Sequence, residues 1–127
     1  MTSTLNKIAA LLALLIGAMA IFAGGQVLLG RDPGYYVIDW LPVYNFSVGI
    51  LSVFPTALFI WRKRKYALSA VLATFGAHAI VMLTLQIGYS SVVAADSIRA
   101  MTLRLSVWLV ILVLMLIQTR RTQTAVN

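Results

Sequence analysis

Four long apolar stretches, separated by short polar connections, dominate the sequence. They cover about residues 8–29, 42–61, 67–89 and 97–117. Each supplies the roughly 20 predominantly apolar residues that a helix needs to cross the hydrocarbon core of a bilayer. The pattern predicts a single all-α membrane domain with four transmembrane helices. Pro55 falls inside the second stretch and is expected to bend that helix, unless nearby hydroxyl groups satisfy the freed backbone.

The connections between the stretches are short and chemically distinct. Residues 31–41 form the longest and contain the turn signal Asp32-Pro33-Gly34. Residues 62–65 are a very short basic turn, and residues 90–96 are a short polar loop that ends in Asp96, a helix-capping residue. Short connections make successive helices antiparallel neighbours, so we expect an up-down four-helix bundle.

Basic residues gather on one side of the predicted bundle. Lys7, the turn at 62–65 and the pair Arg120 and Arg121 all fall there. On the opposite side, positive and negative charges nearly cancel. The charged residues there are Arg31, Asp32, Asp39 and Asp96. Because loops rich in lysine and arginine stay in the cytoplasm, both termini are predicted to be cytoplasmic. The pattern fits the inner membrane of a bacterium.

Composition agrees with a membrane protein and excludes several functions. Apolar residues make up 61% of the chain and charged residues only 10%, against about 45–50% and about 25% in soluble domains. The net charge is +7, but the basic residues flank apolar stretches instead of forming a stripe with aromatic residues, so nucleic acid is not an expected partner. The absence of cysteine excludes thiolate chemistry and cysteine-based metal sites.

Arg104 is the most informative residue of the chain. It lies about seven residues inside the fourth predicted helix, and so roughly 10 Å below the outer boundary at about 1.5 Å per residue. A charge at this depth costs a few kcal/mol, which makes it a functional-site hypothesis by default. The alternative is a structural arginine that donates hydrogen bonds to neighbouring helices.

Each predicted helix brings a polar side chain to this outer half of the membrane. The four residues are Gln26, Asn45, Gln86 and Arg104. Buried amides in lipid need hydrogen-bond partners, so we expect them to converge into one outward-opening cluster, although simple helix packing is also a common role for them. The expected rim and counter-ion of the cluster are Tyr35, Tyr44, Tyr89 and Asp39.

His78 is the only histidine and lies near the middle of the third predicted helix. The simplest interpretation is a neutral imidazole that forms a hydrogen bond across the bundle. Contact with a proton pathway, a quinone, a haem or a chlorophyll is the alternative. Haem would need a second axial ligand or an open position, and Met82 is on the same helix and cannot reach the opposite face. Zinc is not expected, because three suitable ligands are missing.

One face of the first predicted helix carries small residues at spacings of three and four. They are Ala9, Ala13, Gly17, Ala20 and Gly24. Small residues let helix backbones approach closely in lipid. We expect Ala13, Gly17 and Gly24 to pack against another helix, either of this chain or of a partner protein.

Three short motifs resemble the membrane anchor of quinoprotein glucose dehydrogenases. They are Gly24-Gly25-Gln26-Val27-Leu28-Leu29, then Pro33-Gly34-Tyr35-Tyr36, then the basic turn before Ala67-Leu68. The family's propeller domain and the tryptophan- and glutamate-bearing stretch of its third helix have no counterpart in these residues. The resemblance implies contact with ubiquinone near the outer surface, with Arg104 or Arg99 at the headgroup.

Three functions remain open at the level of sequence. No nucleophile–base pair, metal triad or membrane-embedded acid is present, which disfavours an enzyme. The minimal loops and the small-residue face favour an accessory or assembly subunit of a larger inner-membrane complex. The polar cluster favours a module that binds a lipid or a quinone, and a small oligomeric transporter or channel is the third hypothesis. Expected partners are membrane lipids and either other membrane proteins or further copies of this chain.

Overall fold

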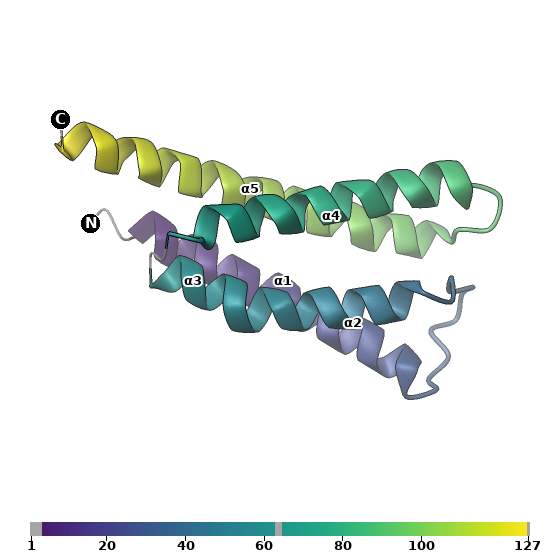
Figure 1. The fold of residues 1–127 in the computed structure, drawn as a ribbon. Coiled ribbons are helices and arrows are strands. Elements are labelled where there is room, and N and C mark those ends of the chain that lie inside the picture. Colours follow the sequence, from purple (N-terminus) through teal and green to yellow (C-terminus); the bar gives the residue numbers. More distant parts are fainter. Residues whose placement is uncertain (1–3, 63–64, 127) are drawn as a thin grey trace.

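The computed structural model describes residues 4–62 and 65–126 and is all-α over these residues (Figure 1). Four helical spans are long and apolar enough to cross a membrane. They are Thr4–Leu28, Leu41–Trp61, Ala67–Gly88 and Ala95–Arg121. These spans coincide with the four apolar stretches of the sequence. Lys63 and Arg64, in the middle of the predicted basic turn, lie outside the described residues.

The second span is a continuous helix with one widened turn. It consists of α2 (Leu41–Leu51), the π-helical segment η1 (Ser52–Thr56) and α3 (Ala57–Trp61). The N–H of Ala57 donates to the carbonyl of Ser52, five residues earlier, as a π turn requires. Pro55 has no N–H for the regular ladder, so the wider turn accommodates it without breaking the helix.

The other spans are single helices: α1 (Thr4–Leu28), α4 (Ala67–Gly88) and α5 (Ala95–Val126). The sequence led us to expect the last helix to end near residue 117, but α5 continues to Val126. No glycine or proline follows Ile117, so the polar end of the chain contains no strong stop signal.

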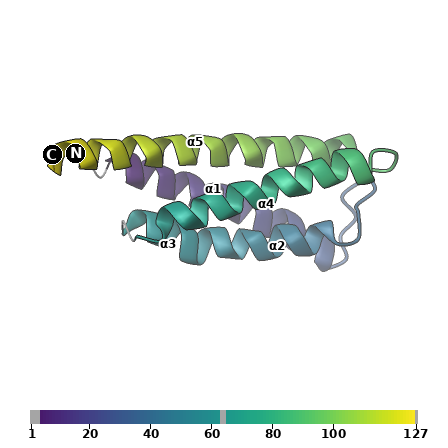
Figure 2. The ribbon, with the colours of Figure 1, turned by 45° about the horizontal axis from the view of Figure 1, so that its top comes forward.

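The helices lie roughly alongside one another, with α1 in contact with most of the others (Figures 1 and 2). One side of α1 packs against α2, η1 and α3, and another packs against α5. Helix α4 packs mainly against α5 and more sparsely against η1 and α3. The connections at 29–40 and 89–94 lie at one end, which we call the loop end (Figure 1). The start of α1 lies at the other end, where the ammonium group of Lys7 lies 5.6 Å from the ring centre of Trp61.

Glycines allow a close approach between α1 and α2. A Cβ atom added at Gly24 would lie 2.6 Å from the carbonyl oxygen of Pro42 and 2.8 Å from the backbone nitrogen of Phe46. One at Gly17 would lie 2.9 Å from the Cβ atom of Ser52. Ala13, on the same face, is fully buried. The small-residue face of α1 is therefore used within the chain.

The interior divides into two apolar clusters with buried polar side chains between them. The cluster nearer the start of α1 includes Ile60, Val71, Phe75, Trp108 and Ile111. The cluster nearer the loop end includes Ile38, Leu41, Met82, Leu85 and Met101. Along α4, His78 falls between residues of the two clusters, and Arg104 does so along α5. Both side chains are buried.

Candidate functional site

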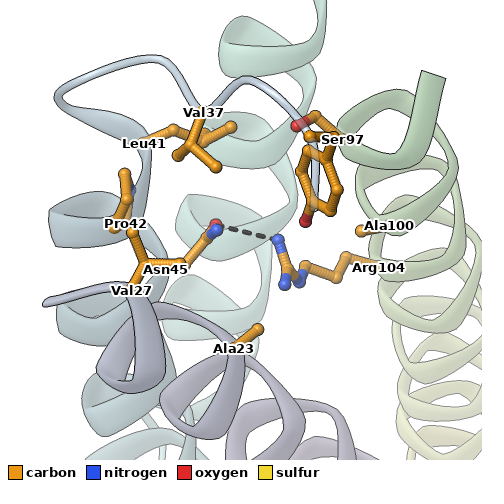
Figure 3. A pocket seen from close by; sticks show the side chains of 10 residues that line it. Ala23, Val27, Val37, Leu41, Pro42, Asn45, Ser97, Ala100 and Arg104 are labelled. Carbon is orange, nitrogen blue, oxygen red and sulfur yellow. Dashed lines mark hydrogen bonds between the residues drawn. The ribbon is translucent and has the colours of Figure 1, made fainter. Parts of the chain in front are cut away.

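Arg104 lies inside the bundle and reaches across it from α5 to α2 (Figure 3). Its side chain is only 6% exposed. Its Nη1 donates a hydrogen bond of 2.8 Å to the Oδ1 of Asn45. The predicted convergence of these two residues is therefore present in the structure.

Both side chains lie on the inward faces of their helices. On α5 the buried residues Met101, Arg104, Trp108 and Ile111 recur at spacings of three and four, so Arg104 falls on the face that packs against the bundle. Helix α2 begins at Leu41 with Pro42 in its first turn. The N–H groups of this turn have no partner within the helix, so the missing N–H of proline loses no hydrogen bond. Asn45 is then one turn inside α2, at the depth of Arg104.

A hollow of about 50 Å³ lies beside the guanidinium group. Ala23 of α1, Asn45 of α2 and Arg104 of α5 line it, and Figure 3 shows them on its different sides. The other polar residues of the lining are Tyr35 from the loop and Ser97 from the first turn of α5. We call this space the inner hollow.

A second hollow, of about 300 Å³, adjoins the first on the side of the loop end. The two hollows share Ala23, Val27 and Tyr35 as lining residues. Gln26 and Arg31 line only this second space, which we call the outer hollow. Gln26 is therefore close to the site, but it lines the outer hollow and not the space beside Arg104.

Asp39 is not the counter-ion of Arg104, which corrects the sequence-based expectation. Its side chain is exposed on the loop. The ion pair found among the described residues joins Asp96 and Arg99 at 3.3 Å, on the surface of α5. The partner of Arg104 is the neutral side chain of Asn45, where a carboxylate was expected. The buried guanidinium group therefore has no acidic partner within the described part of the bundle.

Gln86 also lies outside the cluster, which is a second correction. Leu85 and Met82 are buried on the inward face of α4, whereas Gln86 is exposed. Successive residues of a helix are about 100° apart, so the neighbour of an inward-facing residue points away from it. Gln86 therefore faces the surroundings of the bundle.

A second polar bridge runs beside the first, between α2 and α4. Tyr44 and His78 share a hydrogen bond between Oη and Nδ1. The ring of His78 also stacks edge-on against Trp108 of α5, with the ring centres 6.3 Å apart. His78 thus has the cross-bundle hydrogen bond that its simplest interpretation required. No group of three or more His, Cys, Asp or Glu side chains suited to a metal ion occurs within the described residues.

Tyr89 lies near the loop end, where it meets Trp40. The indole Nε1 of Trp40 donates a hydrogen bond of 3.1 Å to the Tyr89 hydroxyl. This contact ties the end of α4 to the start of α2 and leaves Tyr89 outside the lining of both hollows. Tyr35, not Tyr44 or Tyr89, is the tyrosine that lines both.

Sequence reasoning missed Ser97 and Ala23 as lining residues. Ser97 was given no role in the site from the sequence, although its position seven residues before Arg104 puts it on the same helical face. Ala23 has no polar or charged group that could have marked it in the sequence. It contributes to the hollows through the space that its small side chain leaves open.

Comparisons with known proteins give no family for this chain: no family model, no curated protein and no solved structure matches it. The resemblance to the quinoprotein membrane anchor therefore stays a prediction based on short motifs. The functional argument rests on the geometry around Arg104.

Proposed function

We propose that this chain is a membrane-embedded binding module for an amphipathic molecule, whose polar head occupies the hollow beside Arg104. One observation carries the proposal. Arg104 is 6% exposed as a residue, its guanidinium group has one hydrogen-bond partner among the described residues, the neutral Asn45, and it lines a hollow.

The energetics of a buried arginine support a ligand at this position. A guanidinium group has five N–H donors, and the described residues supply an acceptor for one nitrogen, Nη1. Burying a charge that is not neutralised by an opposite charge costs several kcal/mol in a protein interior. A head group that accepts hydrogen bonds from the remaining donors would offset this cost.

The proposal includes an orientation in the membrane. We place the four helices as an up-down bundle with both termini in the cytoplasm of a bacterium, so that the loop end and both hollows lie in the outer half of the inner membrane. The distribution of basic residues supports this, since Lys7, Arg62, Lys65, Arg120 and Arg121 belong to the opposite end. A ligand would then enter from the outer leaflet.

The other two functions remain predictions. An accessory subunit was favoured by the small-residue face of α1, but Gly17 and Gly24 of that face are in contact with η1 and α2. A protein partner would have to use a different face of the bundle. A transporter or channel has no specific support from the two hollows, which lie on the side of the loop end.

Native mass spectrometry of the protein, extracted gently from its own membrane, tests the proposed function. We expect the wild-type chain to retain a small amphipathic molecule, and the Arg104→Leu variant to lose it while keeping its helical circular dichroism. Arg99→Leu is the matched control, because Arg99, the alternative headgroup contact of the sequence analysis, is exposed, pairs with Asp96 and lines neither hollow. Equal retention by all three proteins would contradict the proposal.

A further inference from the structure

The lining of the inner hollow carries a positive charge and no carboxylate. Its ten residues include one cation, Arg104, and three neutral polar side chains, those of Tyr35, Asn45 and Ser97. The three acidic residues of the chain lie elsewhere. Asp32 lines only the outer hollow, and Asp39 and Asp96 are exposed.

The polar groups of this lining are suited to donating hydrogen bonds. The Oδ1 of Asn45 already accepts from Arg104, so the amide nitrogen is the part of that side chain left to donate. The hydroxyls of Tyr35 and Ser97 can donate as well. Together with the guanidinium group, they favour a ligand rich in acceptor oxygens.

We infer, on the basis of the proposed function, that the ligand's head group is a phosphate that leaves the molecule with a net negative charge. A neutral carbonyl, such as that of a quinone, would accept a hydrogen bond but would leave the charge of Arg104 without compensation. A phosphate supplies both the charge and several acceptors, and arginine binds it with two parallel hydrogen bonds. The inner hollow thus selects for charge as well as for hydrogen bonding.

The size and position of the two hollows match such a lipid. The inner hollow, at about 50 Å³, has room for a few small polar groups. The adjoining outer hollow, at about 300 Å³, can take the rest of a head group. Arg31 and Asp32 both line this outer space, so their charges offset each other and Arg104 is the cation that distinguishes the inner hollow.

We take one exposed residue to mark the exit of the acyl chains. Ala23 lines both hollows and is itself exposed on α1, a helix whose exposed surface is largely apolar. In the proposed site, the acyl chains leave beside Ala23, toward the hydrocarbon of a surrounding bilayer. A lipid could keep its chains in the membrane while its phosphate reaches Arg104.

Titration of the full chain in neutral detergent micelles, followed by native mass spectrometry, tests this inference. The probes are phosphatidylglycerol, zwitterionic phosphatidylcholine, ubiquinone and inorganic phosphate. We expect phosphatidylglycerol to bind at least about tenfold more tightly than phosphatidylcholine or ubiquinone. The preference should vanish in Arg104→Gln, persist in part in Arg104→Lys, and be unchanged in the surface control Arg99→Gln.

The remaining outcomes separate this inference from the proposed function. If inorganic phosphate displaces phosphatidylglycerol at comparable concentration, the phosphate chemistry is correct but the ligand is a free ion, which overturns the amphipathic ligand of the proposed function. Ubiquinone or phosphatidylcholine binding through Arg104 as tightly as phosphatidylglycerol would overturn the anionic ligand but leave an amphiphile-binding module. No binding of any probe that depends on Arg104 would overturn both. Circular dichroism of each variant shows whether it is folded.

Discussion

Arg104 and Asn45 are 59 residues apart in the chain, yet the guanidinium Nη1 of one donates to the amide Oδ1 of the other at 2.8 Å. A neutral amide thus pairs with a buried cation. The bond fixes the position of the guanidinium group without neutralising it. A carboxylate in place of the amide would fix the position of the guanidinium group and also neutralise its charge. Little charge would then be left for a ligand to compensate.

Replacing Asn45 with leucine should destabilise the protein by about 1–3 kcal/mol, because a buried donor of Arg104 loses its partner. The measurement is unfolding in mixed micelles by increasing concentrations of sodium dodecyl sulfate, followed by circular dichroism. Gln86→Leu is the matched control, since Gln86 is an exposed polar residue on α4. Equal losses of stability in the two variants would show that the bond between Asn45 and Arg104 has no special role.

Tyr44 and His78 should be coupled, because their side chains share a hydrogen bond across the bundle. Double-mutant cycles in a membrane protein give coupling energies for such bonds that average about 0.6 kcal/mol and reach about 1.7 kcal/mol. The cycle consists of Tyr44→Phe, His78→Leu and the double variant, with unfolding free energy as the readout. Additive effects would indicate that the two side chains contribute independently. His78 would then need another explanation for its burial.

Enlarging Ala23 should close the mouth of the site without touching Arg104. We expect Ala23→Ile to reduce the amount of retained amphiphile severalfold while changing stability little, because the side chain is exposed. Ala18→Ile is the control, as Ala18 is exposed on the same helix and lines neither hollow. Native mass spectrometry of both variants provides the comparison. Undiminished retention in Ala23→Ile would exclude entry beside this residue.

The number and type of the helices could be predicted from the sequence, because length and apolar composition alone decide whether a segment can cross a bilayer. The meeting of Asn45 with Arg104 could also be predicted, since both lie at the same depth in their helices. The end of α5 at Val126 could not, because no residue after Ile117 forces a helix to stop.

The rotation of each helix was the part that sequence could not provide. In a membrane protein, residues that face lipid and residues that face the bundle are both apolar, so the pattern does not mark the inward side. Gln86 was therefore placed in the cluster although it faces outward. Asp39 was chosen as counter-ion by charge alone, whereas the fold leaves it on an exposed loop and gives Arg104 an amide instead.

Gly24 should tolerate no side chain. The Cβ atom of Gly24→Ala would lie 2.6 Å and 2.8 Å from backbone atoms of α2, which can give way only if the helices separate. We expect a loss of about 1–3 kcal/mol in unfolding free energy, as for other overpacked sites. Gly76→Ala, on α4 with no heavy atom within 4 Å of the new Cβ, should instead be neutral or stabilising by up to about 1 kcal/mol. Equal changes in unfolding free energy for the two variants would mean that α1 and α2 are not in close contact.

The proposed orientation can be tested with single cysteines, because the natural chain contains none. Tyr36 lies in the connection at the loop end and Tyr66 lies just before α4, and both side chains are more than half exposed. With both termini in the cytoplasm, a membrane-impermeant maleimide should label Tyr36→Cys in intact bacteria and Tyr66→Cys only after the cells are opened. The two variants replace the same residue type, so their intrinsic reactivities are comparable. The reverse pattern would place the loop end and both hollows in the cytoplasmic half of the membrane, and the ligand would then have to come from the inner leaflet.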